Sequence, residues 1–304
     1  LATFRGRPLD CSMTFMGGIS AIVFQNATPR FFDCDEHSLI DLALVERELT
    51  TASAEGRLPK ALIVTDLYGI ACDIASARAL CDRYGVALIA DAAESLGSRV
   101  NNHAAGAGAD FTILSFNGNK IITSSGGGAL LSDNKAHIDR ARYLSQQARV
   151  HVPYYQHVEV GYNYRLSNIC AAIGRAQLAK LDERVAMRRA IFDAYRKHLS
   201  TIDGITFLEE PKDCVSNRWL SVIFIDPATG HTPESVRQAL ETHNIEARPL
   251  WKPMHMQPVF AGSTTVGGAV GERLFVRGLC LPSGSGMSDA DLTQVITTLQ
   301  GIFA

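Results

Sequence analysis

One lysine lies between two apolar runs in the segment ILSFNGNKIITSSGGGALLSD, which spans residues 113–133. Lys120 is followed by hydroxyl side chains and three consecutive glycines, and an earlier apolar run, VALIAD, ends in Asp91. A lysine amine attacks carbonyl carbons and forms Schiff bases when its surroundings lower its pKa. A solvated surface turn is the simpler explanation of this lysine taken alone, so the rest of the chain has to distinguish the two interpretations.

Pyridoxal phosphate is a cofactor that needs both residue types, because it binds covalently to a lysine and requires an aspartate at its pyridine nitrogen. Asp91 could keep that nitrogen protonated, so that the ring accepts the electrons of a substrate carbanion. Ser115, Thr123, Ser124 and the glycines at 126–128 could supply hydroxyl and N–H groups to the phosphate. A nicotinamide enzyme is the weaker alternative, because no GxGxxG motif follows an apolar run.

Short apolar runs that end in polar residues recur through the first half of the chain. They cover residues 61–64, 86–90, 110–115 and 128–131, and a helical pattern spans residues 74–84. Strands that are apolar throughout indicate a sheet that is covered on both faces. The sequence therefore predicts an α/β fold with a mostly parallel sheet.

The carboxyl ends of parallel strands lie along one edge of a sheet, where ligands bind. The polar residues that close these runs are Asp66, Asp91, Glu94, Ser115 and Lys120. We expect these side chains to converge on that edge. Taken singly, Asp91 could be a helix cap and the glycine run a tight turn, but their order along the chain favours a cofactor site.

A different organisation follows Asn168. One long helical pattern runs to Leu199, and the apolar segments GITFLE and WLSVIFI follow it. The segment TPE at residues 232–234 predicts the start of another helix, with proline in the first turn after a capping hydroxyl. We therefore predict a large domain over residues 1–180 and a small α+β domain over residues 181–304.

The composition excludes several classes of protein. The 304 residues carry a formal net charge of −2, so no basic field attracts nucleic acid or an anionic membrane surface. No apolar stretch has the length of a transmembrane helix. The seven cysteines contain no CxxC pair, which indicates reduced thiols in a cytoplasmic protein, and the nine histidines show no metal-ligand spacing, so we predict no metal.

Four motifs in this order resemble the DegT/DnrJ/EryC1/StrS aminotransferases. They are DAAESLGS (91–98), SFNGNK (115–120), SSGGGALLSD (124–133) and GYNYRLSNI (161–169). These relatives are pyridoxal-phosphate enzymes of the aspartate-aminotransferase-like fold (fold type I) that aminate nucleotide-linked keto-sugars. The form SFNGNKIIT looks most like the UDP-4-amino-4,6-dideoxy-N-acetylglucosamine transaminases of bacillosamine-type pathways, which act on C4 of a UDP-linked 4-keto-6-deoxy-N-acetylhexosamine.

The resemblance implies a role for each matching residue. Lys120 would hold the cofactor covalently and then act as the acid and base that moves protons during turnover. Asp91 would pair with the pyridine nitrogen, and Glu94 would lie near the O3′ atom of the ring. Ser115 would bind the phosphate, and Phe15 would stack on the face of the ring. Glutamate would be the amino donor.

Further residues are implied by the same resemblance. Asn163 would reach the cofactor phosphate of a neighbouring subunit, so the active unit would be a homodimer with shared active sites. Arg248 and His255 resemble the segment that lines the sugar-nucleotide site, although both could equally be ordinary surface groups. We expect Trp219 in the core of the small domain rather than as a platform for the substrate.

The beginning of the chain differs from the family pattern. Family members carry, before the TF motif, a Ser-Gly-Thr-type turn and a helix whose N-terminus binds the cofactor phosphate. Here the TF motif already lies at residues 14–15. The resemblance therefore implies an N-terminally truncated chain with an exposed apolar sheet face. The alternative to an aminotransferase is a truncated, non-catalytic homologue with a structural or regulatory role.

Overall fold

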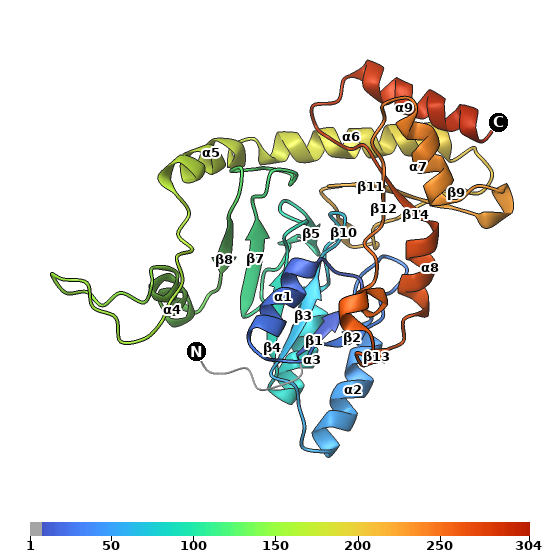
Figure 1. The fold of residues 1–304 in the computed structure, drawn as a ribbon. Helices are drawn as coiled ribbons and strands as arrows, with labels where there is room; N and C mark the ends of the chain where they lie inside the picture. The colour runs from blue at the N-terminus through green and yellow to red at the C-terminus, as the bar shows by residue number, and fades with distance from the viewer. Residues whose placement is uncertain (1–7) are drawn as a thin grey trace.

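The computed structural model describes residues 8–304, and a seven-stranded sheet forms its centre (Figure 1). In spatial order the strands are β13 (Thr265–Val266), β2 (Arg30–Phe32), β1 (Leu9–Cys11), β3 (Ala61–Thr65), β4 (Ala87–Asp91), β7 (Phe111–Ser115) and β8 (Gly128–Leu131). All neighbouring pairs are parallel except β7 and β8, which are antiparallel. The predicted α/β class with a mostly parallel sheet is confirmed.

The register of the central strands brings their carboxyl ends together. Thr65 lies opposite Asp91 across β3 and β4, and Asp91 lies opposite Ile113 across β4 and β7. The three strands therefore end almost level with one another, and the polar residues that follow them share one edge of the sheet.

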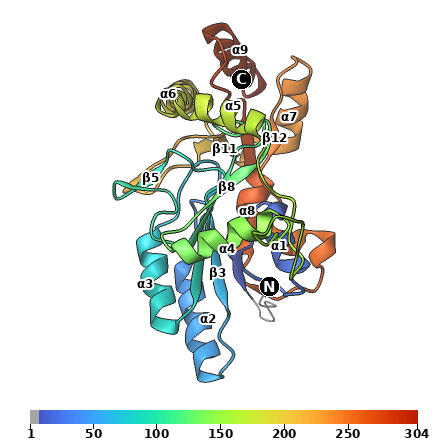
Figure 2. The same ribbon diagram turned by 90° about the vertical axis from the view of Figure 1, so that its left-hand side faces the viewer.

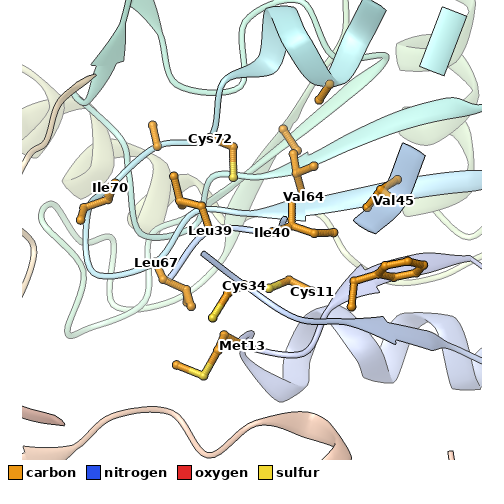
Figure 3. Packing of buried hydrophobic residues seen from close by; sticks show 14 of the residues in the cluster. Cys11, Met13, Cys34, Leu39, Ile40, Val45, Val64, Leu67, Ile70 and Cys72 are labelled. Carbon is orange, nitrogen blue, oxygen red and sulfur yellow. The ribbon is translucent and has the colours of Figure 1, made fainter. Parts of the chain in front are cut away.

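Helices cover both faces of this sheet. One face packs against α2 (Leu42–Ala54) and α3 (Ile74–Tyr84), and the other packs against α1 (Met16–Phe24) and the short helices η2 (Met254–Met256) and η3 (Pro258–Phe260). Figure 3 shows Cys11, Cys34 and Cys72 among the aliphatic side chains of the first core. All seven cysteines are free and six of them are buried, as predicted for reduced thiols.

Helix α3 has the bounds that the sequence predicts. The side chain of Asp73 accepts a hydrogen bond from the backbone N–H of Ser76 at its start. Gly85 ends the helix with φ 64°, a left-handed conformation that glycine adopts without a steric penalty. Both ends of the helix are therefore set by local residues.

The small domain is built on a four-stranded antiparallel sheet. In spatial order its strands are β12 (Arg248–Pro249), β14 (Gly278–Leu281), β11 (Ser221–Ile225) and β9 (Ile205–Phe207). Apolar side chains of α6 (Leu181–Leu199), α7 (Pro233–Glu241) and α9 (Asp289–Ile302) pack on this sheet. Thr232 caps α7 and Pro233 is its first residue, as the segment at 232–234 predicts.

Two features differ from the expected organisation. The single helix expected over residues 168–199 is two helices, α5 (Asn168–Leu178) and α6. The two helices pack on different domains: α6 packs on the small domain, whereas Gly174 of α5 lies against Ser124 of the large domain. The predicted boundary at residue 180 does not separate the sheets cleanly. Strand β13, from the second half of the chain, joins the seven-stranded sheet.

The remaining elements lie outside the two larger sheets. They are β5 (Arg99–Val100), β6 (His103–Ala104), α4 (Lys135–Ser145), β10 (Cys214–Val215), η1 (Pro227–Thr229) and α8 (Ala269–Arg277). Among them, β10, β5 and β6 form a three-stranded sheet. Figure 2 views the molecule from the side on which α4 and β8 lie, and the segment between α4 and α5 extends away from the sheet in Figure 1. Within residues 8–304 no helix is both long and apolar enough to cross a membrane.

Candidate active site

A cavity of about 830 Å³ opens at the carboxyl edge of the large sheet. Its lining includes all five polar residues that were expected to converge there, namely Asp66, Asp91, Glu94, Ser115 and Lys120. The expected convergence is therefore confirmed. Phe15 and Arg248 line the same cavity.

Lys120 lies in the turn that joins β7 to β8. Its backbone N–H donates to the carbonyl of Asn117 (3.1 Å), and Phe116 exchanges backbone hydrogen bonds with Gly127 and Ser124 across the base of the turn (3.0 Å each). Gly127 has φ 84°, and a Cβ atom there would lie 2.4 Å from Leu166. A glycine is thus required for the turn that presents the lysine.

The amine of Lys120 meets an acid and an aromatic ring. Its Nζ atom lies 3.3 Å from Oε1 of Glu94 and 4.1 Å from the centroid of the Trp219 ring. Glu94 also accepts hydrogen bonds from the backbone N–H of Tyr68 (2.9 Å) and from Nε1 of Trp251 (3.3 Å). Burial raises the pKa of Glu94, and the charge of Lys120 opposes that rise.

Asp91 presents one unused oxygen to the cavity. Its Oδ1 atom accepts from the backbone N–H of Ala93 (3.1 Å), whereas Oδ2 receives no hydrogen bond from the residues that the structure describes. A Cβ atom on Gly18 would lie 3.3 Å from this Oδ2, so the glycine keeps the approach to the carboxylate open. Burial raises the pKa of Asp91, and the Ala93 N–H group and Lys120 oppose that rise.

Two further carboxyl groups lie buried close to Asp91. Asp66 accepts hydrogen bonds from the backbone of Cys72 and the hydroxyl of Ser95, and burial raises its pKa to about 7. Asp10 in β1 is fully buried; neither of its oxygens makes a well-aligned hydrogen bond with the described residues, although the Cys11 N–H and the Thr65 hydroxyl lie close enough to lower its pKa. Burial and the charge of Asp91 both raise the pKa of Asp10. Sequence reasoning missed Asp10, although an acid in the centre of an apolar strand is a visible signal.

Two of the expected site residues do not line this cavity. Asn163 is exposed, and its backbone forms an isolated bridge with Gln146. His255 instead lies between Ser12 and Glu272: its Nδ1 atom is hydrogen-bonded to the Ser12 hydroxyl, and Nε2 is 2.9 Å from the carboxylate of Glu272. The functional roles expected for both residues stay predictions.

Two tryptophans, Trp219 and Trp251, also line the cavity. Trp219 is only 2% exposed, as expected of a core residue, and yet its ring faces the Lys120 amine. The centroid of the Trp251 ring lies 6.3 Å from that of Trp219 and 6.2 Å from that of Phe15. These contacts join segments more than 30 residues apart, so no local pattern could have indicated them.

The residues present fit pyridoxal phosphate. The cavity has the volume of a typical small-molecule site. It combines a lysine amine, a buried carboxylate with a free oxygen and the 58% exposed ring of Phe15. The Oγ atom of Ser115 accepts from the N–H of Asn117 (3.3 Å), so its hydroxyl proton is available to a phosphate oxygen.

Comparison with known proteins places the chain in one family. Residues 9–300 match the model of the DegT/DnrJ/EryC1/StrS aminotransferase family. The Bacillus subtilis protein EpsN, named as a pyridoxal phosphate-dependent aminotransferase, is 47% identical over 96% of this chain and 76% of its own length. A GDP-perosamine synthase of Vibrio cholerae is 32% identical over 96% of this chain and 78% of its own length.

A solved structure supports the same assignment. The crystal structure of a DegT DnrJ EryC1 StrS aminotransferase from Brucella abortus superposes with a TM-score of 0.90 at 26% identity, covering 99% of this chain and 81% of that one. The chain is thus shorter than these relatives, and residues 1–7 of the unmatched beginning lie outside the described residues. With its lysine, its carboxylate and its sheet arranged as described, the chain belongs to the DegT/DnrJ/EryC1/StrS aminotransferase family.

Proposed function

We propose that this protein transfers an amino group from glutamate to C4 of a UDP-linked 4-keto-6-deoxy-N-acetylhexosamine, with pyridoxal phosphate as cofactor. The observation that carries the proposal is the pairing, in one cavity, of the Lys120 amine with the free carboxylate oxygen of Asp91. The family supports a sugar aminotransferase for glycan biosynthesis. The choice of UDP and of C4 rests on the motif SFNGNKIIT and its neighbours.

Each residue of the cavity has a distinct task in this reaction. When bound, pyridoxal phosphate supplies an electron sink for the carbanion that forms as a proton leaves the substrate carbon. The Lys120 amine removes the α-proton of glutamate and later delivers a proton to C4 of the sugar. Asp91, through its free Oδ2, holds a proton at the ring nitrogen. Glu94 would orient the lysine amine, because its Oε1 atom lies 3.3 Å from Nζ of Lys120.

Further residues, inside the cavity and beside it, would position the reactants. Phe15 offers its exposed ring as a surface for stacking, and Ser115 offers its hydroxyl to the phosphate. Arg248 is exposed and lines the cavity, so its guanidinium would bind a diphosphate there in place of its present partner Glu246. His255 would act indirectly, by fixing η2 against Ser12 of the cofactor domain.

The second part of the proposal is that two chains share each active site. Exposed apolar side chains gather on β8, on the segment after α4 and on α5; they are Leu130, Leu131, Tyr154, Tyr155, Val158, Val160, Tyr164, Ile169, Ile173 and Leu178. Such a surface favours burial against a second copy of the chain. Asn163 lies in the same segment and is exposed, so a partner chain could receive its side chain.

Complementation between inactive variants tests the shared site. Lys120→Ala and Asn163→Ala are each expected to be inactive or nearly so. After the two are unfolded and refolded together, half of the dimers are mixed, and one of their two sites has both residues intact. About a quarter of the wild-type sites are then expected to be active. Absence of any recovery in mixtures that contain mixed dimers would refute the shared site.

The substrate is tested with the purified protein, pyridoxal phosphate, glutamate and a set of nucleotide-linked 4-keto-6-deoxy sugars. We expect 2-oxoglutarate to form with the UDP-linked N-acetylhexosamine, and NMR of the product to show the amine on C4. A GDP-linked 4-keto-6-deoxyhexose is the second candidate, because relatives at 30–32% identity are GDP-perosamine synthases. Lys120→Ala is the control. Absence of turnover with every sugar, in protein that does not bind the cofactor at Lys120, would favour the non-catalytic alternative.

A further inference from the structure

Trp219 is fixed more rigidly than packing in a core requires. It lies in the small-domain segment that leads into β11, and its Nε1 atom donates to the carbonyl of Asn119, the residue before Lys120 (2.8 Å). Its own backbone N–H donates to Oδ1 of Asn217 (2.8 Å), and its carbonyl accepts from the guanidinium of Arg188 in α6. The indole hydrogen bond therefore orients the ring, and the two backbone hydrogen bonds fix the segment that carries it.

Asn217, which accepts a hydrogen bond from Trp219, also contacts the segment that carries Glu94. The Nδ2 atom of Asn217 donates to the carbonyls of Glu94 (3.0 Å) and Leu96 (2.9 Å), and its backbone N–H donates to the hydroxyl of Ser98 (2.8 Å). Gly69 packs against the same segment, and a Cβ atom there would lie 2.2 Å from Oδ1 of Asn217. The ring and the acid on the two sides of Lys120 are thus held by one hydrogen-bonded unit.

The ring face of Trp219 is directed at a charge. The face of an indole ring carries negative electrostatic potential, and it attracts an ammonium group more strongly than a neutral amine. Nζ of Lys120 is 4.1 Å from the ring centroid and has 12% side-chain exposure, so water screens this attraction only partly. Among the described residues, the charged groups recorded against the amine are Glu94 and Asp91.

We propose that Trp219 is a positioning residue for Lys120. Trp219 holds the ammonium group of Lys120 against its ring face, and its indole N–H fixes the preceding residue, Asn119. The meaning of this for catalysis rests on the proposed function, because Lys120 is the base of that reaction. The contact itself is a property of the cofactor-free chain. It slows the reaction of the amine with electrophiles, since a nitrogen held against the ring face is less free to approach a reagent in the cavity.

Fluorinated tryptophans test the electrostatic part without changing the shape of the side chain. One, two or three fluorine atoms on the indole of residue 219 weaken the negative potential of its face step by step. Trace acetic anhydride at a fixed neutral pH then labels the lysines of the cofactor-free protein, and peptide mass spectrometry compares Lys120 with the exposed Lys212. We expect labelling of Lys120 to accelerate with each fluorine, to about tenfold for three, as the contact that holds the amine weakens.

A matched control is the same fluorine series at Trp251, which also lines the cavity but donates its N–H to Glu94 and has no recorded ring contact with Lys120. No acceleration is expected there. Equal labelling rates across the series at residue 219, or the same acceleration at residue 251, would overturn the proposal.

A pair of substitutions tests the positioning part in the loaded enzyme. Trp219→Phe keeps a ring face but loses the bond to Asn119, and Trp219→Leu loses both. We expect kcat to fall in the order wild type, Phe, Leu with little change in KM for the sugar, and the leucine variant to fall by about tenfold or more. Equal kcat in all three proteins would contradict the proposal.

A separate experiment shows whether the proposed function itself is wrong. Borohydride reduction of the wild-type protein with pyridoxal phosphate, followed by peptide mapping, shows whether the cofactor attaches to Lys120. A negative result there removes the catalytic role of the lysine, while the labelling experiment on the cofactor-free chain still decides whether Trp219 holds its amine.

Discussion

The buried carboxyl of Asp66 makes the stability of this protein depend on pH in a direction that can be worked out. Burial raises its pKa from 3.8 to about 7, against hydrogen bonds from Ser95 and Cys72. When the pKa of a carboxyl group is higher in the folded state than in the unfolded state, the group contributes its full stability at pH values below the unfolded-state pKa. That contribution is lost as the pH rises through about 7.

The magnitude follows from the two pKa values. Each pKa unit corresponds to about 1.4 kcal/mol, so ionising Asp66 in the folded protein costs on the order of 4 kcal/mol between pH 3.8 and pH 7. Asp66→Asn removes this cost and keeps both contacts, because the amide oxygen accepts from the Cys72 N–H and the amide nitrogen donates to the Ser95 hydroxyl. The advantage of the variant over the wild type should grow by about 3 kcal/mol between pH 5 and pH 8.

Urea unfolding of the cofactor-free protein at several pH values measures this difference. Comparing one variant with itself across pH cancels any constant effect of the amide on packing. Asp110→Asn is the control, and its effect on the pH dependence should have the opposite sign. Burial opposes ionisation of Asp110 too, but the Leu88 N–H and Arg78 outweigh burial and hold the pKa of Asp110 low. A difference between Asp66→Asn and wild type that stays constant from pH 5 to pH 8, or shrinks, would refute the reasoning.

Two further predictions concern the cavity. Asp91→Asn should fold normally but lower kcat by about tenfold to thousandfold, because a neutral amide cannot favour a protonated ring nitrogen; steady-state turnover with glutamate measures this. Gly18→Ala should weaken binding of pyridoxal phosphate, because the new Cβ atom lies 3.3 Å from Oδ2 of Asp91. Absorbance titration measures this binding. The same substitution should stabilise α1 by up to about 1 kcal/mol. Gly301→Ala in α9 is the control, which should leave cofactor binding unchanged because a Cβ atom there meets nothing within 4 Å.

Most of the sheet and the edge that carries the cavity could be predicted from local sequence patterns. The apolar runs that end in Asp91 and Ser115 are strands β4 and β7, and the ends of α3 coincide with Asp73 and Gly85. These features depend on residues within a few positions of one another: an apolar run, a capping side chain and a glycine in the left-handed region. The convergence of the polar residues then follows from the rule for parallel strands.

The features that could not be predicted depend on contacts between distant segments. Nothing local indicates that β13 joins the large sheet, because two residues provide no periodicity. The break between α5 and α6 lacks a glycine or proline at residues 179–180, and it follows from packing on different domains. The hydrogen bond between His255 and Ser12 joins residues that lie 243 positions apart, so no local pattern indicates it.

The balance of charge in the cavity explains why a cationic ring would be accepted there. Burial raises the pKa of Asp10, Asp66, Asp91 and Glu94, and among the described residues Lys120 is the cation that opposes this rise, at Asp91 and Glu94. Ionising all four acids around a single lysine would leave uncompensated buried negative charge, which is costly. A protonated pyridine nitrogen at Oδ2 of Asp91 adds a second cation where a carboxylate oxygen has no partner. Binding of the cofactor should therefore favour the ionised form of Asp91, and the protein should release a proton as the ring takes it up.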